Sequence, residues 1–221
     1  MMTGTRARFD RELAQLQERI LDMGSLAHTA VARGLQALVD GNADLAREVI
    51  AADAGLNRLR YEIEGECYHL LVTEQPVAGD MRTIVSAVII VTELERIADH
   101  GKKIARTYLR MLDDPRMAPL GDIPRLGEKA LGLLDRALRS VATRDVQEAR
   151  AVCRADDQVD ALYKQAFNLT ISYMLENPRL IASGAHLIGV AHELERVGDR
   201  ATNVAERVIY AVTGELIELN V

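Results

Sequence analysis

The chain of 221 residues has few aromatic residues, few cysteines and prolines, and no tryptophan. Aromatic side chains make up 4% of it, so its core has to be built from Leu, Ile, Val, Ala and Met. With 15 glycines and 5 prolines, long uninterrupted helices are favoured over an all-β fold with many turns. Its two cysteines, Cys67 and Cys153, form neither a C-x-x-C motif nor a disulfide framework, which favours small buried thiols over a redox role.

The sequence also lacks a positive net charge, a long apolar run and an apolar leader. Its formal net charge of −6 argues against nucleic-acid binding, which requires a basic surface. The most apolar run, Ile84–Val91, is far shorter than the ~20 residues that span a membrane. The N-terminus has no signal-peptide core. We therefore expect a cytoplasmic protein without direct membrane insertion, peripheral at the inner face of the membrane only through its partners.

Apolar residues recur at helical spacing along the whole chain. In the first segment they are three or four positions apart, as in a helix that buries one face. These residues are Phe9, Leu13, Leu16, Ile20, Met23, Ala27, Ala30, Val31, Leu35 and Leu38. A break at Gly41 and Asn42 follows, and Asn42 is suited to cap the next helix. A second pattern runs from about Ala43 to Val72 and a third from Asp80 to about Leu112, separated by Pro76.

The same cycle follows once more after a proline-rich segment. Residues 113–124 hold three of the five prolines and mark a linker. The sequence then predicts helices over Pro124–Thr143, Asp145–Glu176 and Pro178–Val212.

The second half is a degenerate copy of the first. "AREVIAAD" from Ala46 matches "ARAVCRAD" from Ala149, and Pro76 matches Pro178 about one hundred positions later. We therefore predict an all-α protein of six helices in two tandem, internally repeated three-helix bundles. The first bundle covers residues 1–113, the linker 114–124 and the second bundle 125–221, each bundle being of ordinary domain size.

Two Glu/Asp pairs at one-turn spacing lie at matching positions of the repeat. "ELERIADH" from Glu93 contains Glu95 and Asp99, and "ELERVGDR" from Glu193 contains Glu195 and Asp199. On a helix this spacing stacks two like charges on one face, which costs a few tenths of a kcal/mol. Either that face is solvated or something positive lies against it.

A further acidic pair lies on the preceding helix of the second half. Asp156 and Asp160 share the helix face of the apolar Tyr163 and Phe167. An unpaired buried carboxylate costs several kcal/mol, so these groups have to be protonated, paired with a base or bound to a metal. In the first half the matching acid is Asp53. The candidate metal ligands are thus Asp53, Glu95 and Asp99 in the first half and Asp156, Asp160, Glu195 and Asp199 in the second.

Oxygen ligands of this kind suit Mg²⁺, Ca²⁺, Mn²⁺ or iron, whereas structural Zn²⁺ usually takes Cys or His. A metal-dependent carboxylate-bundle enzyme is one alternative interpretation. The Glu-x-x-His pairs typical of di-iron bundles are missing, since Ala98 and Gly198 follow Glu95 and Glu195 at that spacing. The sequence also has no phosphate-binding loop and no nucleophile motif, so we predict no catalytic residue.

A metal-free helical scaffold is the other alternative. In that case the acidic faces are neutralised by basic residues from across the bundle, and the candidates are Arg82, Arg96 and Arg196.

Three segments of the sequence resemble the PhoU family, which comprises accessory and regulatory proteins of bacterial phosphate transport. They are "QPVAGDMR" at 75–82, "LERIADH" at 94–100 and, most specifically, "LERVGDRATNVAERVIYAVTG" at 194–214. The resemblance covers essentially the whole chain. It implies two three-helix bundles, each with an acidic E(D)-x-x-x-D motif able to hold a multinuclear cluster of iron or zinc ions.

The resemblance also implies partners and a role. A PhoU-like protein couples the ATPase subunit of the phosphate ABC transporter to a membrane sensor histidine kinase. It restrains uptake and starvation signalling when phosphate is plentiful, and it is expected to form a homodimer.

The two acidic sites differ in ways that predict unequal metal binding. In the second half the acidic residues and His192 form a continuous strip, whereas in the first half Lys102 and two further basic residues stand among the acids. Three positions differ between the halves. Where the second half has Asp160, Asn203 and Glu206, the first half has Asn57, Lys103 and Arg106, respectively. Since fewer acids and more cations weaken cation binding, we expect the second-half site to bind metal more firmly.

Overall fold

The computed structural model describes residues 2–117 and 120–217, with side chains from Arg6 onward. Its helices are α1 (Met2–Asp40), α2 (Ala43–Glu74), α3 (Ala78–Arg110), α4 (Ile123–Thr143), α5 (Val146–Ala155), α6 (Asp157–Glu176), the 3₁₀ helix η1 (Pro178–Leu180) and α7 (Ile181–Thr213). These residues include no strand, which confirms the predicted all-α class. Residue 1, residues 118–119 of the predicted linker and residues 218–221 lie outside the described part.

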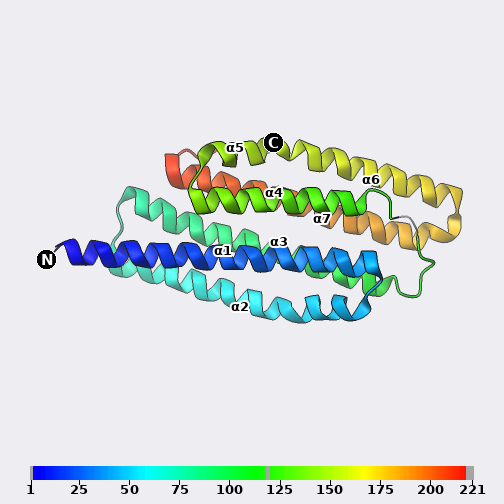
Figure 1. Ribbon diagram of the computed structural model, residues 1–221, viewed down its shortest axis with the longest axis horizontal. Coiled ribbons are helices and arrows are strands. Elements are labelled where there is room, and N and C mark those ends of the chain that lie inside the picture. The colour runs from blue at the N-terminus through cyan, green and yellow to red at the C-terminus, as the bar shows by residue number, and fades with distance from the viewer. Residues whose placement is uncertain (1, 118–119, 218–221) are drawn as a thin grey trace.

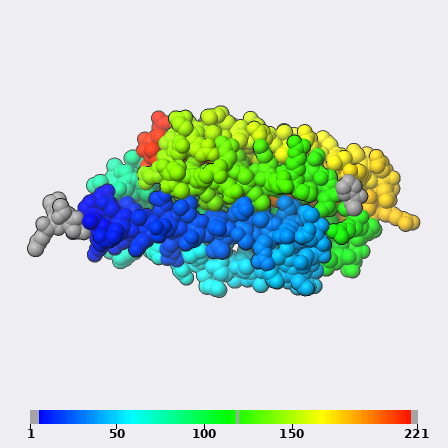
Figure 2. Space-filling view, in the orientation of Figure 1, coloured from blue at the N-terminus to red at the C-terminus, as the bar shows by residue number. Residues whose placement is uncertain are grey.

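The helices form two bundles that lie side by side (Figure 1). Helices α1, α2 and α3 pack together in one bundle, and α4, α5, α6 and α7 pack in the other. The bundles meet where α3 packs along α7 and α1 along α4. In the space-filling view they form one elongated body, with α1 running along the boundary between them (Figure 2). None of the described helices is both long and apolar enough to cross a bilayer.

The predicted apolar stripes form the core. Met23, Ala27 and Val31 of α1 are fully buried, as are Leu194 and Val197 of α7. The buried side chains of both bundles belong to one continuous hydrophobic cluster. The domain boundaries inferred from the sequence stay a prediction.

Both cysteines are buried and free. Burial raises the pKa of the Cys67 thiol to about 12 and that of the Cys153 thiol to about 11. Because the thiolate is the reactive form, these two groups are inert at neutral pH.

Helix α2 begins where the sequence predicts. Gly41 adopts a left-handed backbone conformation with φ of +70°, which glycine permits without strain. The side chain of Asn42 then accepts a hydrogen bond from the backbone N–H of Leu45 at 3.0 Å and caps the helix.

The prediction of one continuous helix from Asp145 to Glu176 is wrong, because the helix is interrupted at Asp156. Aspartate competes with the backbone for hydrogen bonds in helix interiors but is favoured in the first turn. Asp157 and Asp160 both lie in the first turn of α6, where the helix dipole stabilises their charge. The break therefore turns one predicted helix into α5 and α6 and makes a seventh α-helix.

Helices α1 and α3 approach each other at backbone distance. A Cβ atom placed on Gly101 would lie 2.6 Å from the carbonyl carbon and oxygen of Ala30. A Cβ atom placed on Gly34 would lie 2.5 Å from the carbonyl oxygen of Gly101. Only glycine fits at these two positions.

Two related polar contacts cross the interface between α3 and α7. Glu93 accepts hydrogen bonds from Nη1 of Arg200 and Nδ2 of Asn203, both at 3.1 Å. At the matching place, Nδ1 of His100 lies 2.5 Å from Oε2 of Glu193. Since Glu93 corresponds to Glu193 and His100 to Arg200, the repeat relates the two contacts to each other.

Candidate metal centre

Three aspartates of the second bundle come together at the break between α5 and α6. Asp156, Asp160 and Asp199 each offer a carboxylate oxygen, and these oxygens all lie within 4.8 Å of one another. Asp156 is only 2% exposed, whereas Asp160 and Asp199 are half-buried. The absence of a side chain at Gly198 allows this approach, because a Cβ atom there would lie 3.0 Å from Oδ1 of Asp156.

Glu195 lies one turn before Asp199 on α7, outside the group of three converging aspartates but near enough for the charges of Asp199 and Asp160 to act on it. Its Oε2 is buried and accepts no hydrogen bond from the described residues. Nδ1 of His192 is 3.2 Å away and forms an ion pair with it only when the imidazole is protonated. A buried carboxylate oxygen without a donor is costly, so this atom is suited to a cation.

Two carboxylates of α7, Glu195 and Asp199, have a pKa above the ordinary value. Burial raises the pKa of Glu195, and the charges of Asp199 and Asp160 raise it further. Burial also raises the pKa of Asp199. The charge of Arg196 lowers this pKa, whereas the charge of Asp160 raises it. Nη1 of Arg196 is 3.8 Å from Asp199, and the arginine side chain is 43% exposed, so this pair neutralises the cluster only weakly.

In the first bundle an ammonium group lies between the corresponding carboxylates. Nζ of Lys102 is 2.8 Å from Oδ2 of Asp53 and 2.6 Å from Oδ1 of Asp99, and its side chain is 13% exposed. Lys103 adds a contact of 3.1 Å to Oδ2 of Asp99. Although burial opposes ionisation of Asp99, the hydrogen bonds from both lysines hold its pKa below the ordinary value.

The other acids of the first bundle also have basic or amide partners. Nη1 of Arg60 lies 3.6 Å from Oε2 of Glu95, and its Nε donates to Glu64 at 2.8 Å. Nδ2 of Asn57 donates to Oδ2 of Asp53 at 3.2 Å. The first site therefore carries its own neutralising charges.

These contacts match the salt-bridged alternative in the first bundle, but with different partners from those expected. Arg60, Lys102 and Lys103 supply the charge there, whereas Arg96 pairs with Glu93 at 3.0 Å. Arg106, which was also expected to dilute the first site, is exposed. Sequence reasoning missed Arg60. Its position four residues before Glu64 was the available signal, since residues at that spacing share a helix face.

Two residues of the second bundle lie differently from the expectation. Phe167 is 37% exposed, so the face of α6 that carries Asp160 lies at the rim of the bundle rather than in its core. Glu206 is buried, and its Oε2 lies 3.9 Å from Nη2 of Arg207. It does not belong to the group of three converging aspartates.

The donor set of the second bundle fits a hard or borderline cation. Carboxylate oxygens suit Mg²⁺, Ca²⁺, Mn²⁺ and iron, and zinc also accepts them. A cation here would neutralise the cluster and join the α5–α6 junction to α7.

Comparisons with known proteins find the same domain twice in this chain. The PhoU domain matches residues 20–107 and 123–208, one copy in each bundle. A phosphate-specific transport system accessory protein PhoU homolog from Clostridium acetobutylicum is 34% identical over 98% of this chain and 99% of its own. A homolog of the same description from Caulobacter vibrioides is 37% identical over 94% of this chain and 90% of its own.

Solved structures agree with these relatives. The crystal structure of PhoU from Pseudomonas aeruginosa superposes with a TM-score of 0.87 at 33% identity, covering 94% of this chain and all of that one. The phosphate transport system regulatory protein PhoU from Streptococcus pneumoniae gives a TM-score of 0.88 at 27% identity, covering 95% of this chain and 99% of that one.

Proposed function

Because the chain belongs to the PhoU family, we propose that it is a negative regulator of phosphate uptake and of phosphate-starvation signalling. It acts as a non-enzymatic adaptor between the ATPase subunit of a phosphate ABC transporter and a sensor histidine kinase. The proposal is supported by relatives that are named accessory proteins of the phosphate-specific transport system and match nearly the full chain.

The second bundle holds the principal metal site of this adaptor. Asp156, Asp160, Glu195 and Asp199 are its ligands, and the metal offsets the mutual repulsion of these closely spaced carboxylates. The single observation that carries this assignment is the contrast between the repeats. Three aspartate oxygens converge within 4.8 Å in the second bundle, whereas the Lys102 ammonium lies between Asp53 and Asp99 in the first.

Asp53, Glu95 and Asp99 form a weaker metal site. A metal ion there has to displace Lys102, which costs two hydrogen bonds between charged groups at 2.8 and 2.6 Å. Iron, zinc, manganese, magnesium and calcium are all compatible with these oxygen donors, and competition among them in solution decides the occupant.

We further propose that the adaptor works in the cytoplasm as a homodimer, at the inner face of the membrane where its partners lie. Light scattering on the purified protein measures the dimer directly. A monomer at micromolar concentration would contradict this part of the proposal.

The regulatory role is tested in a bacterial strain that lacks its own PhoU and carries a phosphate-starvation reporter. The wild-type chain should restore repression of the reporter in phosphate-rich medium. A triple Asp156→Asn, Asp160→Asn, Asp199→Asn variant tests whether metal is needed, with Asp53→Asn as the matched control. Failure of the folded wild-type chain to repress the reporter would contradict the role.

A metal-dependent enzyme is the competing function, because a carboxylate cluster can also activate water. Metal-loaded protein is assayed with phosphoesters and with peroxide. Turnover that disappears in the triple Asn variant would establish the enzyme instead of the adaptor.

A further inference from the structure

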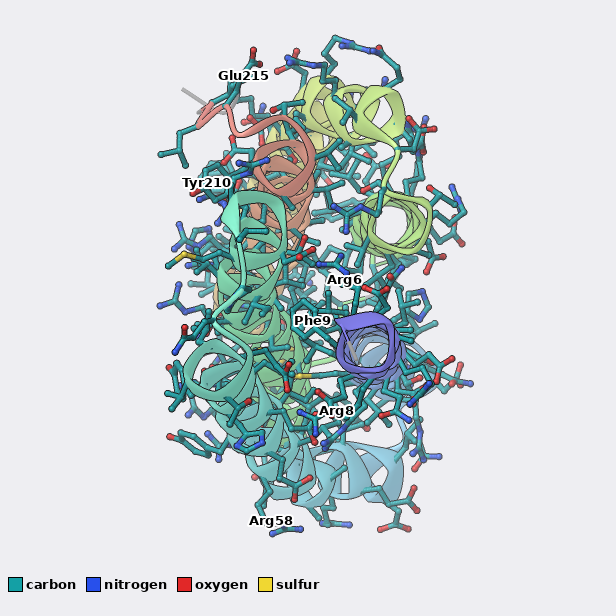
Figure 3. All side chains as sticks on the ribbon, turned by 90° about the vertical axis from the view of Figure 1, so that its left-hand side faces the viewer. Arg6, Arg8, Phe9, Arg58, Tyr210 and Glu215 are labelled. Atoms are coloured by element: carbon teal, nitrogen blue, oxygen red, sulfur yellow. The ribbon has the colours of Figure 1, made fainter. Side chains whose placement is uncertain are left out.

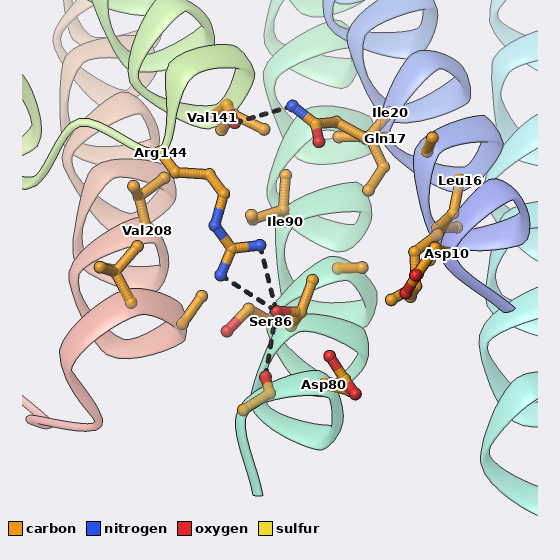
Figure 4. Close-up of a pocket in the computed structure, with 17 residues that line it drawn as sticks. Asp10, Leu16, Gln17, Ile20, Asp80, Ser86, Ile90, Val141, Arg144 and Val208 are labelled. Carbon is orange, nitrogen blue, oxygen red and sulfur yellow. Dashed lines mark hydrogen bonds between the residues drawn. The ribbon is translucent and has the colours of Figure 1, made fainter. Parts of the chain in front are cut away.

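A cavity of about 430 Å³ opens between the two bundles at the end of the molecule where α1 begins and α7 ends. It is lined by α1, α3 and α7 and by the residues that end α4 (Figure 4). Val208 and the following turn of α7 belong to its wall, ~14 Å along that helix from Asp199. The cavity is therefore separate from the candidate metal centres.

Most of the cavity wall is apolar. Leu16 and Ile20 of α1 form one side, Ile90 lies on α3, and Val208 and Val212 come from α7 (Figure 4). Its volume lies within the ~300 to 1,000 Å³ of typical small-molecule sites, which combine apolar walls with a few polar groups.

Hydroxyl groups of α3 lie together on one side of the cavity. The Ser86 side chain is buried, with the residue 1% exposed, yet its Oγ has no hydrogen-bond partner among the described residues. Thr83, one turn earlier, donates its hydroxyl to the carbonyl oxygen of Gly79 at 3.1 Å. A buried hydroxyl without a partner is costly, so Ser86 is suited to a ligand that supplies one.

A guanidinium group reaches the same corner from the end of α4. Arg144 has the left-handed φ of +54° at the C-cap of α4, and its side chain extends across to α3 (Figure 4). Nη1 and Nη2 donate to Oγ1 of Thr83 at 3.3 and 3.4 Å. Among the described residues, no carboxylate lies within 4 Å of this guanidinium, and its hydrogen-bond acceptor is the neutral hydroxyl of Thr83.

The two acids that line the cavity are already paired. Arg6, near the start of α1, places its Nε 2.9 Å from Oδ1 of Asp10 and its Nη1 2.6 Å from Oδ2 of Asp80. Arg6 therefore neutralises both carboxylates. Figure 3 looks onto this end of the molecule and shows Arg6 and Phe9 on α1, on the side of the helix that faces α3. Arg144 therefore remains as the cation available to a ligand.

We propose that this cavity binds a small amphipathic monoanion. Its apolar body packs against Leu16, Ile20 and Ile90, and its carboxylate accepts hydrogen bonds from Arg144 and Ser86. At ~30 Å³ per water-sized group, the cavity holds about 14 non-hydrogen atoms. Such a ligand contacts both bundles at once and strengthens their association at this end.

The probe is decanoate, titrated calorimetrically into the full chain after removal of metal by a chelator, so that its carboxylate cannot ligate a bound ion. We expect one decanoate per chain. Arg144→Gln should weaken binding about tenfold, because a charge-assisted hydrogen bond is lost. Arg58→Gln removes an equal charge from α2, which does not line the cavity, and should leave decanoate binding unchanged.

Two further measurements separate the ligand contacts from effects on folding. Ser86→Ala removes the unpartnered hydroxyl, so it should weaken decanoate binding about threefold without lowering the melting temperature of the free protein. Decanol, which lacks the charge, should bind less tightly than decanoate and equally to wild type and Arg144→Gln. Absence of decanoate binding, or equal binding by wild type, Arg144→Gln and Ser86→Ala, would overturn the proposal.

Discussion

Nζ of Lys102 lies 2.8 Å from Oδ2 of Asp53 and joins α3 to α2 inside the first bundle. In the second bundle Thr202 stands at the position that matches Lys102, Asp156 matches Asp53, and Asp160 stands where the first bundle has Asn57. One repeat thus neutralises its carboxylates with its own ammonium group, whereas in the other three aspartates converge with no lysine at the matching position.

Replacing the lysines of the first bundle by their counterparts should create a second firm metal site. The variant Lys102→Thr, Lys103→Asn removes both ammonium groups from Asp99 and one from Asp53. Without these competitors, the affinity of the first site for metal should rise at least tenfold, a change of ~1.4 kcal/mol. Metal content after dialysis against a weak chelator measures it.

The control for this experiment is Lys129→Thr, which removes a lysine from α4 without touching either acidic site. It should retain the wild-type metal content. If the double variant also retains only the wild-type content, Lys102 and Lys103 do not limit metal binding in the first bundle.

The matched substitutions Asp99→Asn and Asp199→Asn should change the stability of the metal-free protein in opposite directions at pH 7. Asp99 is stabilised as a carboxylate by two lysines, so its loss should cost about 1 kcal/mol. Asp199 faces other carboxylates, so its neutralisation should gain a few tenths of a kcal/mol. Urea unfolding in the presence of a chelator measures both.

The pH dependence of these two effects follows from the pKa shifts. The pKa of Asp99 is lowered, so its stabilising contribution is present above ~pH 4 and is lost as the pH falls through the folded-state pKa. The pKa of Asp199 is raised, so its favourable contribution exists at low pH and is lost as the pH rises through the folded-state pKa. Each variant should therefore approach wild-type stability once the pH falls below the folded-state pKa of the aspartate that it replaces, and equal signs at pH 7 would contradict the assignment.

Glu93→Gln should weaken the contact between the bundles. The buried Glu93 carboxylate accepts hydrogen bonds from Arg200 and Asn203 of α7, and the neutral amide leaves the guanidinium without its counter-charge. We expect a loss of about 2 kcal/mol in the free energy of unfolding. Glu48→Gln breaks an exposed pair with Arg33 and should cost about 0.5 kcal/mol or less. Similar losses for the two variants would show that the buried contact contributes no more than a surface pair.

Gly101→Ala should separate α1 from α3. The added methyl group would lie 2.6 Å from backbone atoms of Ala30 and Val31, which cannot rotate away. A loss of about 3 kcal/mol is expected from the forced displacement. The control is Gly132→Ala on α4, where nothing lies within 4 Å, and this change should stabilise the protein by about 0.5 kcal/mol. A Gly101→Ala protein as stable as wild type would refute the close approach.

The helices could be predicted from the sequence because their signals are local. The apolar stripe from Phe9 to Leu38 and the cap at Asn42 each depend on residues within a few positions of one another. The repeat was readable for the same reason, and the two matches to the PhoU domain confirm it. The break at Asp156 was missed because helical periodicity continues across it, and only the density of aspartates indicated an end.

The contacts between helices were less accessible to sequence reasoning. The acidic pairs Glu95/Asp99 and Glu195/Asp199 were found from their spacing, but the partner of Glu95 was not, because Arg60 reaches it from another helix. The cavity beside Ser86 had no sequence signal, since it forms only where the two bundles pack together. The metal ligands themselves stay a prediction.

The difference in metal binding between the two bundles is measured by the metal content of two double variants purified without chelator or metal-affinity resin. Elemental analysis would compare Glu195→Ala, Asp199→Ala with Glu95→Ala, Asp99→Ala. We expect the first variant to lose most of the bound metal and the second to retain most of it. Equal losses in the two variants, or a larger loss in the second, would contradict the claim that the second bundle holds the principal site.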